Sequence, residues 1–173
     1  MEIRQATAND SGVLSALALA AKAHWGYSHA TMTRWERQLR VSALEIAAKS
    51  LRVAEIDGEA VGFYALAHKG KAWRLDDLWV APAFRRQGIG RALLMHALDI
   101  AFHGGGLRVT VDADPNAEAF YLACGAIRCG EIAAPLVDEP DRIRPQLVFC
   151  KSAGDAAGLE KTRQSSVLST RAV

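Results

Sequence analysis

Two glycines and three arginines stand close together near the middle of the chain, in the stretch RRQGIGR at residues 85–91. Gly88 and Gly90 lack a Cβ atom, so the backbone N–H groups around them can approach a ligand closely. An amphipathic stretch begins here, and the positive end of the dipole of the expected helix favours anions. The stretch therefore predicts a loop that binds a pyrophosphate group. The flanking cations are Arg85, Arg86 and Arg91.

The spacing of this loop excludes the two commonest kinds of nucleotide-binding loop. The dinucleotide-binding pattern GxGxxG needs a third glycine at position 93, where this chain has Leu93. A nucleoside-triphosphate P-loop ends in Gly-Lys-Ser or Gly-Lys-Thr, and the chain contains neither tripeptide. The pattern that remains is RxxGxG, placed directly after an expected strand.

A second ordered segment, NAEAFYLACG at residues 116–125, follows a β-branched run at 109–112 that is consistent with a strand. Residues 75–85 approach the first loop as a strand followed by VxPxxR. These segments resemble the two coenzyme A-binding signatures of the GNAT superfamily of N-acetyltransferases. The segments KAHWGYS at 22–28 and ADPNAEAFY at 113–121 are similar to a recurrent bacterial subgroup of that superfamily.

The resemblance implies an α+β fold over residues 1–151, with a mixed, mostly antiparallel central sheet and helices on both faces. The hydrophobic periodicity is consistent with that fold. The expected strands are 2–6, 52–56, 60–66, 73–80, 109–112, 126–128 and 146–150. The expected helices are 11 to 22–24, 34–48, 88–102 and a short one from about 116. A loop at 130–143 joins the last two strands, and 152–173 is expected to be a tail outside the core.

The same resemblance implies acetyl-CoA as co-substrate. Backbone N–H groups of the loop would hold its pyrophosphate, and the backbone of the residues just before the loop would follow the pantetheine arm. Asn116 would contact the pantetheine or cap a helix start, and both roles are open. The expected cofactor-binding residues are Val80, Ala81, Arg85, Arg86, Gln87, Gly88, Ile89, Gly90, Arg91, Asn116 and Tyr121.

Tyr121 is also the expected catalytic acid. When an amine attacks the thioester, a coenzyme A thiolate departs and needs a proton. A phenol with a pKa of about 10 stays protonated at neutral pH and can supply it. The alternative is an ordinary core tyrosine beside Phe120.

An acceptor amine of the lysine type, with a pKa of about 10.4, arrives charged and must lose a proton before it attacks. The resemblance implies a general base on the strand at 73–80, where many GNAT proteins place a carboxylate that faces the acceptor. In a regular strand Asp76 and Asp77 project to opposite faces, so only one of them faces the acceptor. We favour Asp76 as the base and expect Asp77 to contact the substrate. Deprotonation through a water, or a simple ion pair with Arg74, is left open.

An aromatic cluster follows the first expected helix, in the segment HWGYSH at residues 24–29. GNAT proteins line the acceptor pocket in this region, so the resemblance implies that Trp25 and Tyr27 bind the substrate. The alternative is an aromatic staple that packs under the connection between two helices.

Composition limits the other classes of protein. The chain has 173 residues, half of them apolar, and a formal net charge of +2, which favours one domain and argues against a nucleic-acid partner. It contains no run of about 18 apolar residues and begins without the pattern of a signal peptide, so we expect a cytoplasmic protein with no membrane partner. Three cysteines without CxxC spacing predict no metal site.

The sequence thus predicts an N-acetyltransferase that transfers an acetyl group from acetyl-CoA to a primary amine of a small molecule or peptide, by direct attack in a ternary complex. The alternative is a non-catalytic acyl-CoA-binding module of the same fold. Many GNAT domains pair through their C-terminal strands, so a homodimer is also open.

Overall fold

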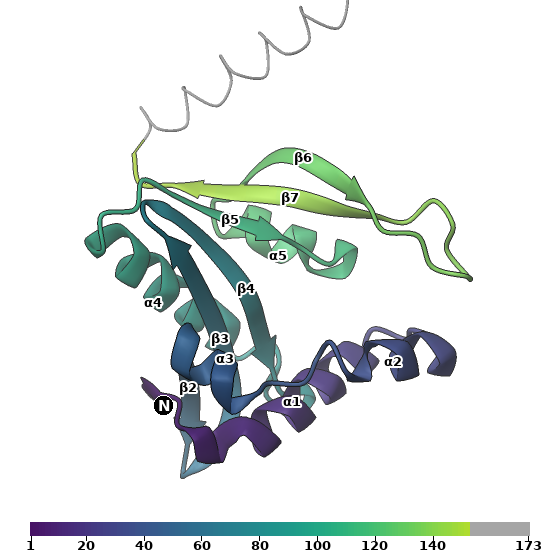
Figure 1. Ribbon diagram of the computed structural model, residues 1–173, viewed down its shortest axis with the longest axis horizontal. Helices are drawn as coiled ribbons and strands as arrows, with labels where there is room; N and C mark the ends of the chain where they lie inside the picture. Colours follow the sequence, from purple (N-terminus) through teal and green to yellow (C-terminus); the bar gives the residue numbers. More distant parts are fainter. Residues whose placement is uncertain (153–173) are drawn as a thin grey trace, which may run out of the picture.

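The computed structural model describes residues 1–152, and the expected tail beyond Ser152 lies outside the described residues. In this part of the chain a strand is followed by three α-helices, three strands, a helix, a strand, a helix and two strands (Figure 1). The strands are β1 (Glu2–Gln5), β2 (Ser50–Ile56), β3 (Glu59–Lys69), β4 (Ala72–Val80), β5 (Arg108–Asp112), β6 (Ile127–Ala133) and β7 (Ile143–Cys150). The α-helices are α1 (Ser11–Ala23), α2 (His29–Glu36), α3 (Ala43–Ala48), α4 (Ile89–His103) and α5 (Glu118–Ala123).

The strands form one sheet in the order β1-β2-β3-β4-β5-β7-β6. Every neighbouring pair is antiparallel except β4 and β5. The expectation of a mixed, mostly antiparallel sheet is therefore confirmed.

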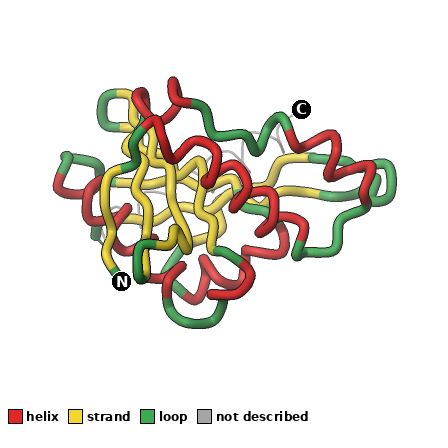
Figure 2. The backbone as a smooth tube through the Cα atoms, turned by 90° about the horizontal axis from the view of Figure 1, so that it is seen from below, coloured by secondary structure: helices red, strands yellow, loops and turns green. Residues whose placement is uncertain are grey.

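Helices cover both faces of this sheet, and Figure 2 shows them on either side of the strands. On one face, α4 places Leu93 and Leu94 against buried side chains of the sheet such as Tyr64. On the other face, α1 places Leu14 and its apolar neighbours against a cluster that includes Phe63. Tyr64 and Phe63 are consecutive residues of β3, so the alternation of side chains along a strand supplies both cores.

The parallel pair β4 and β5 is joined over a short distance only. The two strands pair at Trp73 with Val109 and at Arg74 with Thr110, near the start of each strand. Beyond this point they diverge, as Figure 1 shows, and β4 continues to Val80. The sheet is therefore split open toward the ends of β4 and β5.

The predicted helix at 34–48 is wrong, because two helices occupy this region. The side chain of Ser42 accepts a hydrogen bond from the Glu45 backbone N–H at 3.2 Å, and the Glu45 carboxylate accepts one from the Ser42 N–H at 3.0 Å. This capping box starts a new helix, α3, at Ala43. The predicted loop at 130–143 is also shorter than expected, because β6 continues to Ala133 and β7 begins at Ile143.

Among residues 1–152, no helix combines the length and the apolar character that crossing a membrane requires.

The close approach of α4 to the sheet depends on Gly62 in β3. A Cβ atom at this position would lie 2.8 Å from the Trp79 carbonyl oxygen and 3.0 Å from Leu93 Cδ1. We predict that Gly62→Ala lowers the free energy of unfolding by about 1–3 kcal/mol, because backbone and helix must move apart to admit the methyl group. Urea denaturation measures this change.

Gly12→Ala is the matched control, since a Cβ atom there meets nothing within 4 Å and the residue lies in α1. This substitution should leave the stability unchanged or raise it through helix propensity. Equal stability of the Gly62→Ala variant and the parent would contradict the proposed packing constraint.

Candidate active site

A cavity of about 1000 Å³ opens where β4 and β5 diverge. Its lining comes from α1, α2, β4, β5, α5, the loop before α4 with the start of that helix, and the segment between β6 and β7 with the start of β7. Several of these elements are far apart in the sequence, and the split of the sheet brings them to one site.

The loop before α4 contributes one wall of the cavity. Arg86 and Gly88 both adopt left-handed backbone conformations, with φ values of 63° and 84°. Gly88 is the N-cap of α4, and no side chain of the described part of the chain caps the start of this helix. The first intrahelical bond is donated by Ala92 to the Gly88 carbonyl at 3.0 Å, so the N–H groups of residues 89–91 have no carbonyl partner within the helix. This helix start can bind an anion.

Nine of the eleven residues expected to bind the cofactor line the cavity, namely Val80, Arg85, Arg86, Gly88, Ile89, Gly90, Arg91, Asn116 and Tyr121. Ala81 is not in this lining, and its N–H donates to the Val61 carbonyl at 2.8 Å. Gln87 is not in it either, and its side chain donates to the Ala83 carbonyl at 3.4 Å.

Asn116 does not cap a helix start. Asp114 holds that position instead, because its side chain accepts a hydrogen bond from the Asn116 backbone N–H at 2.9 Å. The Asn116 amide nitrogen donates to Asp114 Oδ1 and to the Tyr27 hydroxyl, both at 3.1 Å.

Tyr121 of α5 is buried and lines the cavity. Its ring packs edge-on against Phe120, with centroids 5.1 Å apart, and against Phe149 at 6.4 Å. Burial is the main cause that raises the pKa of Tyr121 above its ordinary value, and the charge of Asp77 adds to it. The phenol is therefore protonated at neutral pH. The residue is both a core tyrosine and a wall of the cavity.

Asp76 and Asp77 lie at a β-bulge in β4. Ala65 of β3 pairs with Asp77, whereas the next residue, Leu66, pairs with Leu75, so Asp76 is the extra residue. Asp77 therefore shares the face of Ala65, which packs in the cluster under α1. Asp76 contacts Lys49, which directly follows α3 on the same side of the sheet. The prediction that the two carboxylates project to opposite faces is wrong, because the bulge interrupts the alternation.

The two carboxylates differ in their partners. Asp76 forms ion pairs with Lys49 Nζ at 3.0 Å and with Arg74 Nε at 2.5 Å. Asp77 accepts a hydrogen bond from the Trp79 indole N–H at 3.0 Å. Burial raises the pKa of Asp77 above its ordinary value, against the opposing effects of this hydrogen bond and of the Lys49 charge.

Both carboxylates line the large cavity. Asp77 also lines a second cavity of about 20 Å³, together with Glu45 and Lys49. That volume is enough for one water molecule.

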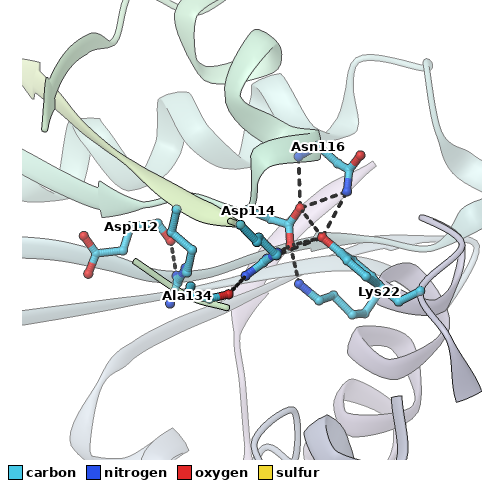
Figure 3. Close-up of polar contacts among 8 residues, drawn as sticks. Lys22, Asp112, Asp114, Asn116 and Ala134 are labelled. Carbon is cyan, nitrogen blue, oxygen red and sulfur yellow. Dashed lines mark hydrogen bonds and ion pairs between the residues drawn. The ribbon is translucent and has the colours of Figure 1, made fainter. Parts of the chain in front are cut away.

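A buried cluster of charges, absent from the sequence prediction, forms another wall of the cavity. The carboxylate of Asp114 lies between Lys22 Nζ at 2.5 Å and Arg142 Nη2 at 2.9 Å, and Figure 3 shows it at the centre of these contacts. The side chains of Lys22, Asp114 and Arg142 are 10%, 7% and 4% exposed. The buried face of α1 is otherwise apolar, and Lys22 is the charged residue on it. A lysine at helical spacing with apolar residues is the feature of the sequence that could have indicated this cluster.

Aromatic rings surround the ammonium of Lys22. The centroids of four rings lie within 6.0 Å of Nζ: Trp35 at 4.3 Å, Tyr27 at 4.9 Å, Trp25 at 5.0 Å and Trp79 at 6.0 Å. Cation–π attraction and the Asp114 carboxylate both favour the ammonium form. Burial, together with the charges of Arg142 and Arg144, outweighs the effect of Asp114 and lowers the pKa of Lys22.

Asp114 remains ionised within this cluster. Burial opposes its ionisation, but the Lys22 charge and the hydrogen bonds from Lys22, Asn116 and Tyr27 outweigh burial and lower the pKa of Asp114.

Trp25 and Tyr27, both expected to bind the substrate, have different positions. Trp25 lines the cavity and packs against Trp79, with centroids 5.8 Å apart. Tyr27 is not in the lining, and its hydroxyl donates to the Asp114 carboxylate at 2.8 Å. Tyr27 therefore stabilises the charged cluster through this hydrogen bond without lining the cavity.

Among residues 1–152, no group of three or more histidine, cysteine or acidic side chains is arranged to hold a metal ion.

Two curated relatives match parts of the sequence. A stretch of 56 residues is 43% identical to an uncharacterized N-acetyltransferase of Archaeoglobus fulgidus, and it covers 28% of this chain and 38% of that protein. A stretch of 79 residues is 37% identical to streptothricin acetyltransferase of Streptomyces lavendulae, and it covers 43% of this chain and 42% of that protein. The chain thus spans less than half the length of either relative.

Solved structures match over most of the fold. A GCN5-related N-acetyltransferase from Rhodopseudomonas palustris superimposes with a TM-score of 0.72 at 22% identity, over 86% of this chain and 94% of that one. The PaiA N-acetyltransferase of Thermoplasma acidophilum, solved in complex with coenzyme A, gives 0.68 at 20% identity, over 86% and 98% of the two chains.

The family model described as Acetyltransferase (GNAT) family matches residues 15–126, which include the split of the sheet, the loop before α4 and Tyr121. The chain belongs to the GNAT family of acetyltransferases.

Proposed function

We propose that this protein is an N-acetyltransferase that transfers an acetyl group from acetyl-CoA to a primary amine. The observation that carries the proposal is a single cavity that combines an uncapped helix start, an unpaired strand edge and the buried phenol of Tyr121. The N-acetyltransferase match from Archaeoglobus fulgidus and the coenzyme A complex of the structural relative support it.

Coenzyme A fits the residues on this side of the cavity. Its pyrophosphate would accept hydrogen bonds from the N–H groups of residues 89–91, with the exposed cations Arg85, Arg86 and Arg91 around it. Beyond Arg74, β4 has no pairing with β5, so its backbone can hydrogen-bond to the amides of the pantetheine arm. Ala81 and Gln87 do not belong to the proposed contacts.

We infer direct transfer within a ternary complex. The amine nitrogen attacks the thioester carbonyl carbon, the C–S bond breaks, and the electron pair of that bond leaves on sulfur. The Tyr121 hydroxyl donates a proton to this thiolate. The attacking nitrogen, which is positively charged once the new C–N bond has formed, releases one proton to solvent, and the tyrosinate regains one from solvent as the products leave.

Asp77 is the better candidate for the base that deprotonates the incoming amine. Asp76 is held in two ion pairs, and these occupy the carboxylate and stabilise its charged form. Asp77 has no direct ion pair among residues 1–152. It lines the cavity and has a raised pKa, which makes its carboxylate a stronger proton acceptor. Asp76 and Lys49 then position the bulge that presents Asp77.

A sensing module that binds acyl-CoA without turnover is the second candidate. It would use the same loop and strand edge, because these elements bind the donor only. It gives no role to a buried phenol and a buried carboxylate in the same cavity, and this observation favours the enzyme.

We predict that the protein binds acetyl-CoA and acetylates an amine, and that Tyr121→Phe retains binding but lowers kcat by about a hundredfold, since the thiolate then leaves without a proton donor. Isothermal titration measures binding, and the release of free coenzyme A thiol measures turnover across a screen of amines.

Phe is the matched replacement, because it keeps the ring packed against Phe149. If no binding of acetyl-CoA is detected at high micromolar concentration, the proposed N-acetyltransferase function is wrong. Binding without turnover by the parent would establish the sensing module instead.

The pH dependence of kcat distinguishes the two carboxylates. A base whose pKa is raised by burial accepts protons only above that pKa, so the rate should fall as the pH drops through a value above the ordinary 3.8 of an aspartate. We predict that Asp77→Asn removes this part of the profile and lowers kcat by about 10²–10⁴-fold.

Asp76→Asn serves as the matched control. It should keep the dependence on Asp77 but shift it to lower pH, because the negative charge of Asp76 no longer raises the pKa of Asp77. Comparison of the two variants at saturating amine separates the titration of Asp77 from that of the acceptor. A parent-like rate and pH profile in Asp77→Asn would exclude it as the base.

A further inference from the structure

The charges in the wall opposite the loop do not balance. Three cations, Lys22, Arg142 and Arg144, line the cavity there, and a single carboxylate, Asp114, lies between the first two of them. The two arginines stay protonated, so a single carboxylate leaves at least one positive charge in this wall without compensation. A buried charge in that state is costly unless an anion meets it.

The neighbouring carboxylate does not supply the missing negative charge. Figure 3 shows the side chain of Asp112 directed away from Asp114 and its partners. Its Oδ1 accepts a hydrogen bond from Gln146 Nε2 at 3.1 Å, and its backbone carbonyl, not its carboxylate, accepts one from Arg144 Nη2.

Arg142 also has an unused donor. Its Nη1 donates to the Ala134 carbonyl at 3.3 Å and its Nη2 to Asp114, but its buried Nε–H has no hydrogen-bond partner among residues 1–152. The Nε atom itself is enclosed by protein, so its unpaired state shows that this guanidinium, which is 4% exposed, is not fully satisfied by the residues around it.

The Trp79 ring lies between the proposed base, Asp77, and the cations Lys22, Arg142 and Arg144, which we call the cationic wall. Trp79 donates its indole N–H to Asp77 at 3.0 Å, and the centroid of the same ring lies 6.0 Å from Lys22 Nζ. A ligand that reaches across Trp79 can place an amine at Asp77 and an anionic group at Lys22 and Arg142. Trp25 and Trp35 line the cavity beside this path and offer apolar surface.

We propose that the acceptor is an amine that also carries a carboxylate, a small molecule of the amino-acid type, whose carboxylate binds at Lys22, Arg142 and Arg144. The proposal rests on the proposed acetyltransferase function and adds the class of acceptor. The same surplus of positive charge disfavours a polyamine or another polycation in this wall.

The first test compares free acids with their amides. The twenty common amino acids and their C-terminal amides, which keep the amine and lose the carboxylate charge, are assayed at saturating acetyl-CoA, with spermidine as a polycation. At least one free amino acid should be acetylated with a kcat/KM about ten- to a hundredfold above that of its amide. Equal or higher activity on the amides, or a preference for spermidine, would overturn the proposal and leave the acetyltransferase function standing.

Substitutions then locate the carboxylate. Arg144→Gln and Arg142→Met should each reduce the preference for the free acid toward one while leaving acetyl-CoA affinity unchanged, and Arg142→Lys should restore part of it. Lys71→Gln, which removes an exposed cation from the turn between β3 and β4, is the matched control and should change nothing. Since Arg142→Met removes a buried ion pair, circular dichroism checks its fold, and the partly buried Arg144 carries the test if it does not fold.

A binding readout separates this proposal from the proposed function. Indole fluorescence reports on the wall directly, because Trp25, Trp35 and Trp79 surround Lys22. Titration with L-phenylalanine and L-phenylalaninamide, without acetyl-CoA, should show binding of the free acid and at least tenfold weaker binding of the amide. That result supports the anion site even in a protein without turnover. Equal binding of acid and amide, or of neither, together with no free-acid preference in turnover, would refute it.

Discussion

The parallel pairing of β4 with β5 stops after two residue pairs, and the rest of the site depends on this limit. If the pairing continued, the backbone of β4 would be satisfied and no cavity would exist between the strands. Trp73 is one of the two paired residues of β4, and it packs against the glycines that end α4: a Cβ atom at Gly106 would lie 2.5 Å from its Cδ1. The connection from α4 to β5 therefore packs closely against the start of β4, where the two strands pair. The far ends of β4 and β5 stay apart.

The walls of the opening use charge in two different ways. On the side of the loop, helix N–H groups and exposed arginines present positive charge to solvent, where a phosphate can reach it. On the opposite side, the charges of Lys22, Asp114 and Arg142 are buried and held by aromatic rings. The first arrangement suits a long, highly charged donor. The second suits a small acceptor that is enclosed.

Features that depend on local sequence could be predicted, and those that depend on distant contacts could not. The loop at residues 85–91 was found because glycine spacing and a helix start are adjacent in the chain. The Lys22–Asp114 ion pair joins residues 92 positions apart, so no local pattern announces it. The prediction that Asp76 and Asp77 project to opposite faces is wrong for a similar reason, because the bulge depends on the register between β4 and the distant strand β3. The start of α3 is different, since the Ser42 and Glu45 capping box was visible in the sequence.

Arg86 shows how stability and ligand binding compete at a single residue. Its φ of 63° lies in the left-handed region, where a side chain costs about 1–2 kcal/mol that glycine does not. A glycine at this position would relax the backbone and make the folded protein more stable, yet it would remove a cation from the proposed phosphate site. The chain thus retains a strained arginine where an easier residue exists, as expected if selection acts on the loop as a binding element and not on its stability alone.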